Sequence, residues 1–164
     1  MNNIFFSGGR RKITRKKTRK LSRKIPRKYT KGLSRKDKDK QKRNIRKSIR
    51  SYKIKKGDKR YVSRPRLSSY KHKKSQWLVK YEKKYGKHNK SYKDISKATG
   101  IPVKALQEVV TKGKGAYYSS GSRPNQTAES WGKARMYSFI IGGPTRKYDN
   151  HIAVKYNLPF AKHN

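Results

Sequence analysis

The sequence predicts a mainly α-helical protein: a small helical domain with a helix-turn-helix-like pair, preceded by a long basic N-terminal extension without its own core. Three observations support this. The 164 residues include 49 Lys or Arg and 8 Asp or Glu, and only 30% are hydrophobic. Residues 1–74 hold 32 Lys or Arg and 3 acids, a net charge of +29, so burial cannot offset their ordering entropy. Residues 75–164 instead show helix caps followed by apolar residues at helical spacing.

A basic repeat occupies residues 10–28, where Arg-Lys pairs recur every four residues from position 15 onward. On a helix this period would align like charges at i and i+4, and Pro26 opposes a helix at its end. We therefore expect residues 1–74 to be disordered unless bound. A solvated charge run or a nuclear-localisation patch is the alternative to polyanion contact. The candidate nucleic-acid-binding residues here are Arg10, Arg11, Lys12, Arg15, Lys16, Arg19, Lys20, Arg23, Lys24, Arg27 and Lys28.

Residues 34–54 predict a conditional helix. Ser34 and Asp37 approximate a capping box, and Ile45 and Ile49 fall near one face. The polar face is nearly all Lys and Arg, which is typical of helices that lie along nucleic acid or an anionic surface. Because the apolar stripe is thin, a stable free helix is not expected. Residues 55–74 contain Pro65 and other breakers and read as a linker.

The helical domain, residues 75–164, opens with three predicted helices. Ser75, Ser91 and Pro102 mark their starts, and Gly86 and Gly100 end the first two. The apolar residues of these helices are Trp77, Leu78, Tyr81, Tyr85, Ile95, Ala98, Val103, Leu106, Val109 and Val110.

The second and third helices, joined through Gly100, resemble a helix-turn-helix. If this pair binds DNA as that motif does, Lys104 and Gln107 face the groove. The alternative is a plain three-helix core in which both side chains are solvated.

The stretch 112–143 predicts a loop followed by one short helix. Gly113 and Gly115 indicate a glycine turn. Thr127 is a good N-cap for a helix that Gly142 terminates. The segment 146–156 predicts a closing helix or strand, and its pattern does not decide between them.

Arg123 lies in the Ser- and Gly-rich loop that precedes this helix. Backbone N–H groups there, together with the guanidinium, could bind one phosphate. In the alternative reading, Ser and Gly satisfy a tight turn and Arg123 bonds a backbone carbonyl or an acid. We keep Arg123 as a candidate phosphate contact.

No catalytic constellation is visible. The acids form no acid/base dyad, the four histidines lack metal-ligand spacing, and cysteine is absent. No apolar run is long enough for a transmembrane segment. We expect a non-enzymatic protein with no cofactor, no metal and no small-molecule substrate.

The run GAYYSSGSRPNQTAESWGKAR, with the preceding GIPVKALQEVV, resembles an uncharacterised domain family of large DNA viruses. The resemblance runs from about Trp77 to Val154 and does not cover the first half of the chain. It implies a viral source, but it carries over no activity and no catalytic residues.

The net charge of +41 requires a polyanionic partner. Together with the viral resemblance, it predicts a basic virion protein that binds and neutralises nucleic acid, with DNA favoured, in genome packaging. The alternative is a minor capsid protein whose extension threads between capsid subunits or along an anionic inner surface. Expected partners are nucleic acid or an anionic surface and other virion proteins. Expected locations are the virion and, during assembly, the host nucleus or a cytoplasmic viral factory.

Overall fold

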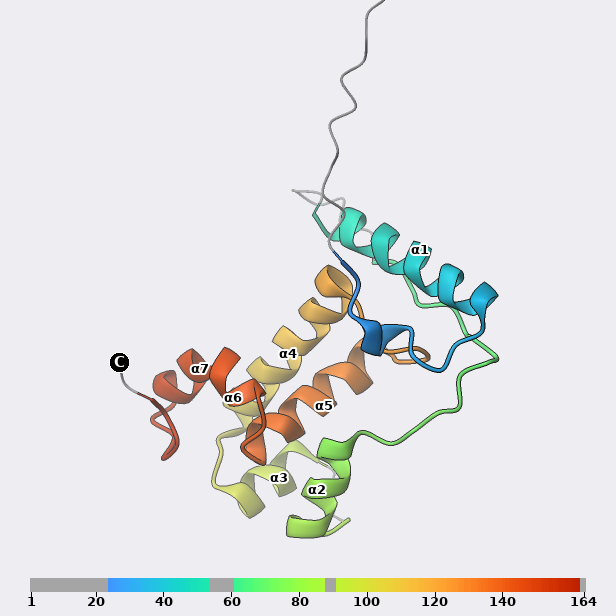
Figure 1. Cartoon of the computed structure of the whole chain (residues 1–164). Helices are drawn as coiled ribbons and strands as arrows, with labels where there is room; N and C mark the ends of the chain where they lie inside the picture. The colour runs from blue at the N-terminus through green and yellow to red at the C-terminus, as the bar shows by residue number, and fades with distance from the viewer. Residues whose placement is uncertain (1–23, 54–60, 88–90, 163–164) are drawn as a thin grey trace, which may run out of the picture.

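The computed structural model describes residues 24–53, 61–87 and 91–162 (Figure 1). Within these ranges the chain forms one 3-10 turn, η1, and seven α-helices, and it contains no strand. The prediction of a mainly helical protein is confirmed. The elements are η1 Arg27–Tyr29, α1 Arg35–Tyr52, α2 Gln76–Tyr85, α3 Tyr92–Thr99, α4 Val103–Ser120, α5 Ala128–Ile140, α6 Thr145–Tyr148 and α7 Asn150–Lys155.

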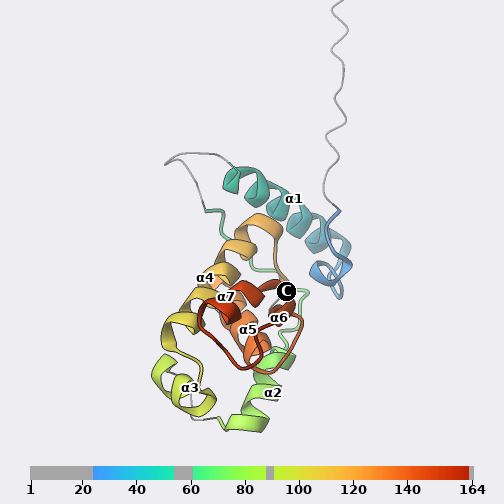
Figure 2. The same ribbon diagram turned by 90° about the vertical axis from the view of Figure 1, so that its left-hand side faces the viewer.

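Helices α4 and α5 form the centre of the fold, and the other helices pack around them (Figures 1 and 2). Helix α2 packs on α5, α3 packs on α4, and α6 and α7 close the remaining side. Burying an apolar side chain of this kind contributes roughly 1.5–3 kcal/mol. The core comprises Tyr81, Ile95, Ile101, Ala105, Leu106, Val109, Val110, Met136, Tyr137, Phe139, Ile140, Ile152, Ala153 and Leu158.

The predicted caps are present. Ser75 accepts a hydrogen bond from the Trp77 amide, and Ser91 accepts one from the Asp94 amide. Thr127 and Ser130 each accept from the other's amide at 3.0 Å. The closing segment that the sequence left open between helix and strand forms α6 and α7.

The glycine turn predicted at Gly113 and Gly115 is wrong, because both residues lie inside α4. Gly113 serves a close helix crossing instead. A Cβ built on it would lie 2.6 Å from the Cα of Gly132 in α5, closer than carbon atoms approach without a shift. The glycine spacing that suggested a turn therefore reflects how closely the two central helices pack.

The packed structure begins well before residue 75, which is where the sequence placed the domain boundary. Tyr29, Leu33, Ile45 and Leu67 are all at most 7% exposed. Helix α1 lies across one end of the α4–α5 pair (Figures 1 and 2). Residues 24–53 and 61–74 pack on the helical domain, where α1 and Arg64 bond the end of α4 and the loop that follows it. The basic repeat from residue 10 to residue 23 lies outside the described residues.

Candidate nucleic-acid interface

Helix α1 presents a strongly cationic surface to solvent, in which Asp39 is the one exposed acid of the helix. Its 18 residues include nine Lys or Arg and two Asp. Positions 36, 40, 43, 47 and 50 follow the three-to-four residue spacing that aligns side chains along one helix face, and position 46 flanks them. Over that span the row extends for about 21 Å at 1.5 Å per residue. We call the six exposed residues of this surface the α1 basic face: Lys36, Lys40, Arg43, Arg46, Lys47 and Arg50.

The opposite face of α1 is buried but largely polar. Gln41 is fully buried and donates to the Ser122 carbonyl at 3.2 Å. Ser48 donates to the Tyr118 carbonyl at 2.9 Å. Tyr118 belongs to the last turn of α4, whose carbonyls have no partner within the helix. Helix α1 therefore supplies hydrogen bonds that the C-terminal end of α4 needs.

Arg64, in the segment after α1, also holds α1 against the C-terminal end of α4. Its guanidinium donates to the Tyr117 carbonyl, to Asn44 Oδ1 at 2.9 Å and to Ser122 Oγ at 3.3 Å. It also lies over the Tyr117 ring, 4.7 Å from the centroid. Burial lowers the pKa of the guanidinium, and the three hydrogen bonds offset the cost of desolvation. A cation at this helix terminus is also favoured by the α4 dipole.

Residues from the first half of the chain pack against the loop 121–126, which the sequence predicted to be a turn or a phosphate cradle. The Asn125 side chain accepts from the Leu67 amide at 2.8 Å and donates to the Leu67 carbonyl at 2.9 Å, as a neighbouring strand would. Gly121 has φ +94°, and a Cβ there would lie 2.9 Å from Ile45 Cγ2. Only glycine allows both this turn and the close approach of α1.

A serine network fixes the N-terminus of α1. Ser69 Oγ donates to Asp37 Oδ2 at 2.6 Å, and the Ser69 amide donates to the same oxygen at 3.1 Å. Ser34, the N-cap, accepts from the Asp37 amide, and its own amide donates to Ser69 Oγ. The two hydrogen bonds from Ser69 hold the pKa of the Asp37 carboxyl below its ordinary value of 3.8.

This carboxyl should make the anchoring of α1 dependent on acid pH. Because the folded pKa is depressed, the stabilisation is complete well above pH 3.8 and is lost as pH falls through the folded value. We expect Asp37→Asn to be less stable than the wild type at pH 7, with the difference shrinking as the pH falls below 3.8 and through the folded pKa of the carboxyl. Chemical denaturation of both proteins across this range measures it. A difference that stayed constant with pH would contradict the role of the charge.

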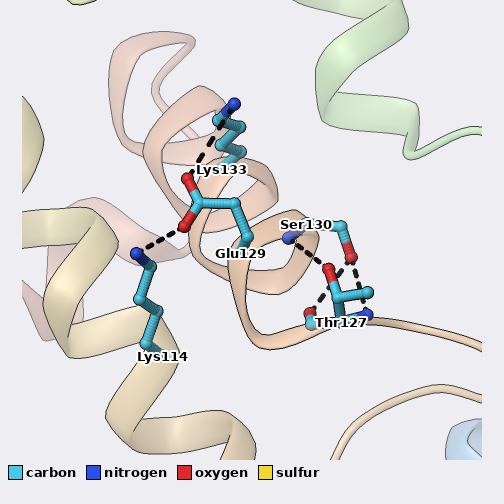
Figure 3. Close-up of polar contacts among 5 residues, drawn as sticks. All are labelled: Lys114, Thr127, Glu129, Ser130 and Lys133. Carbon is cyan, nitrogen blue, oxygen red and sulfur yellow. Dashed lines mark hydrogen bonds and ion pairs between the residues drawn. The ribbon is translucent and has the colours of Figure 1, made fainter.

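Most acids of the described chain are engaged elsewhere. Glu129 pairs with Lys114 and, at 3.8 Å, with Lys133, beside the Thr127 cap (Figure 3). Asp149 is buried and receives two hydrogen bonds from Arg135, at 2.8 and 2.7 Å. The remaining contacts join Glu108 to Lys155, Glu82 to Lys74, and Asp94 to Ser91. None of these acids pairs with the α1 basic face. Asp37 interacts electrostatically with Lys36 and Lys40, but no cation of the face lies within ion-pair distance of a described acid.

The structure separates the predicted contact residues into two groups. Lys24, Arg27 and Lys28 are exposed at the α1 end, where Lys24 and Ile49 line one shallow hollow of about 220 Å³. Arg123 is exposed near Tyr29, and its side chain makes no hydrogen bond to another described residue. Lys104 and Gln107 are exposed on the first turns of α4, at the far end of that helix. Arg10, Arg11, Lys12, Arg15, Lys16, Arg19, Lys20 and Arg23 lie outside the described residues.

Neither a metal-binding cluster nor a membrane-spanning helix is found in the described ranges. No three His, Asp or Glu side chains there gather as metal ligands would. No described helix is both long enough and apolar enough to cross a membrane.

A model of a family of unknown function, DUF5824, matches residues 26–158, which is most of the sequence. The chain belongs to this family. Searches of the curated proteins and of the solved structures found no significant match.

The DUF5824 match covers more of the chain than the resemblance expected from the sequence. The predicted resemblance began near Trp77, whereas the match begins at residue 26 and includes α1. The α1 basic face of this DUF5824 domain was not predicted from the sequence. The sequence of residues 34–54 indicated a charged polar face. It did not show which cations point to solvent, because that depends on which face of the helix docks.

Proposed function

We propose that this protein is a non-enzymatic structural protein that binds and neutralises nucleic acid, with DNA favoured, through the α1 basic face and residues 24–28. The proposal is supported by the different roles of the two faces of α1. Its outer face carries six exposed cations that form no ion pair with a described acid, and its inner face is fixed to α4 by hydrogen bonds. A fixed row of cations suits a regular row of phosphates.

The charge arrangement also links folding to binding. Within the α1 basic face, Lys36–Lys40, Arg43–Lys47 and Arg46–Arg50 are like-charge pairs at i and i+4. Each destabilises an isolated helix by about 0.2–0.5 kcal/mol. Docking of the inner face offsets this repulsion, and a polyanion along the outer face would remove it. Binding should therefore stabilise α1.

The test compares two triple variants of equal charge. Arg43→Gln, Arg46→Gln and Arg50→Gln neutralise the face, whereas Lys112→Gln, Lys147→Gln and Lys162→Gln remove exposed charges elsewhere. Each lost phosphate contact lowers the slope of log affinity against log salt by about 0.9 on duplex DNA. We expect the first triple to lower the slope by about 2.7 and the second by far less. Fluorescence anisotropy with a short labelled duplex measures both.

Equal losses in the two triples would mean that net charge alone drives binding, and the assignment to α1 would fail. Circular dichroism controls for folding. Since the first triple removes like-charge repulsion, its helix content should not fall.

A role in virions and genome packaging is part of the proposal and is supported by the resemblance of the GAYYSSGSRPNQTAESWGKAR run to a viral domain family. The minor capsid role is the second candidate, because an exposed cationic helix equally fits an anionic capsid surface. Fractionation of purified particles separates the two. Loss of the protein with the DNA core supports genome binding, whereas retention in emptied shells supports capsid binding.

A further inference from the structure

A second cationic surface lies at the end of the molecule opposite α1. On α2, positions 80, 83 and 84 fall on one side of the helix, and Lys87 follows directly after its C-cap, Gly86. On α3, positions 93 and 97 are one turn apart. All six side chains are exposed. We call this set the lysine end: Lys80, Lys83, Lys84, Lys87, Lys93 and Lys97.

The two surfaces are separated by the length of α4. Ser48 of α1 bonds the last turn of α4, while α3 leads directly into its first turn. In both views α1 lies at one end of the α4–α5 pair and α2 and α3 at the other (Figures 1 and 2). The 18 residues of α4 span about 27 Å at 1.5 Å per residue.

The region between the surfaces is charge-paired. Glu129 holds Lys114 and Lys133 at the α4–α5 crossing, and Glu108 holds Lys155 at 2.9 Å. These ion pairs lower the net charge of the middle of the molecule, whereas the α1 basic face and the lysine end each carry six exposed cations. Because α4 separates the two ends by about 27 Å and the Debye length is about 8 Å at physiological salt, the ends are electrostatically independent.

The two ends also differ in chemistry. The α1 basic face includes three arginines, whereas the lysine end contains lysine alone. Arginine binds phosphate with a planar fork of donors, but lysine acts as a strongly hydrated point charge. Contacts at the lysine end should accordingly be weaker and should depend chiefly on phosphate charge.

We infer that the lysine end binds a second segment of duplex DNA while the α1 basic face holds the first, so that one chain bridges two segments. The inference rests on the proposed function and extends it. Neutralisation alone needs one surface, whereas two separated surfaces draw duplexes together. Such bridging supplies a physical mechanism for condensation.

The experiment uses the full chain and two short duplexes, one carrying a donor dye and the other an acceptor. Binding to a single duplex is measured in parallel by anisotropy. The test variant is Lys83→Gln, Lys87→Gln and Lys97→Gln, whose side chains make no ion pair with a described acid. The matched control is the Lys112→Gln, Lys147→Gln and Lys162→Gln triple.

Wild type and control should bring the two dyes together. The lysine-end triple should bind a single duplex within about twofold of the control but should need roughly tenfold more protein to bridge, because three phosphate contacts are lost. Equal bridging by both triples would overturn the inference, as would wild-type binding without energy transfer, which means that one duplex occupies both ends. If the wild type fails to bind a single duplex, the proposed function itself fails.

Discussion

Replacing Arg64 with alanine is expected to release α1 from the helical domain while the α4–α5 core stays folded. The guanidinium joins Asn44 of α1 to the Tyr117 carbonyl and to Ser122. A hydrogen bond to a charged group contributes about 1.5–3 kcal/mol, and its loss leaves partly buried acceptors unpaired. We expect α1 to lose at least about 3 kcal/mol of protection against local unfolding.

Hydrogen exchange followed by mass spectrometry measures this directly, since α1 peptides are resolved from α4 and α5 peptides. Arg66→Ala is the matched control: it removes the same side chain two residues away, where the residue is exposed. Arg64→Lys tests whether the planar guanidinium is required, because lysine keeps the charge but cannot reproduce the three directed donors. Exchange in α1 should accelerate in both Arg64 variants and stay unchanged in Arg66→Ala. Unchanged α1 protection in Arg64→Ala would show that Arg64 is not the anchor.

The helical domain was predictable because its signals are local. Ser75, Ser91 and Thr127 stand directly before apolar residues at helical spacing, and all three cap helices in the structure. A cap depends on the few residues that follow it, so no knowledge of the tertiary fold is needed.

The docking of α1 was not predictable from hydrophobic pattern. Its buried stripe includes Asp37, Gln41 and Ser48, side chains that usually indicate a solvated face. Their partners are Ser69, Ser122 and Tyr118, and the last two lie 81 and 70 residues away. Because burial of polar groups requires specific partners, it leaves no periodic apolar signal in the sequence.

The same reason explains why the candidate site was only partly found. The charged repeat and the charged polar face of residues 34–54 were visible in the composition. Choosing the outward cations of α1 requires knowing which face docks, and that face is set by its contacts with Tyr118, Gly121 and Ser122. Gly113 was misread for a similar cause, since a glycine that admits a neighbouring helix looks locally like a glycine that makes a turn.

Gly113→Ala is expected to destabilise the whole helical domain, although the same change normally strengthens a helix. Alanine is favoured over glycine within a helix by about 1 kcal/mol. Here the added Cβ would lie 2.6 Å from the Gly132 Cα and 3.3 Å from the Arg135 Cβ. The first contact is with backbone, so α4 and α5 must move apart, and overpacking of this kind costs about 1–3 kcal/mol or more.

Gly115→Ala is the matched control, two residues along the same helix. Its Cβ would lie 3.3 Å from the Tyr52 hydroxyl, the far end of a side chain that can shift. We expect Gly115→Ala to melt at or slightly above the wild-type temperature. Gly113→Ala should melt several degrees lower, since about 1 kcal/mol corresponds to roughly 2–4 °C for a chain of this size. Both are measured by circular dichroism on nuclease-treated protein, because bound nucleic acid would stabilise the fold by mass action. Equal melting of the two variants would mean that the α4–α5 crossing opens without cost. In that case the glycine pair would not set the distance between the central helices.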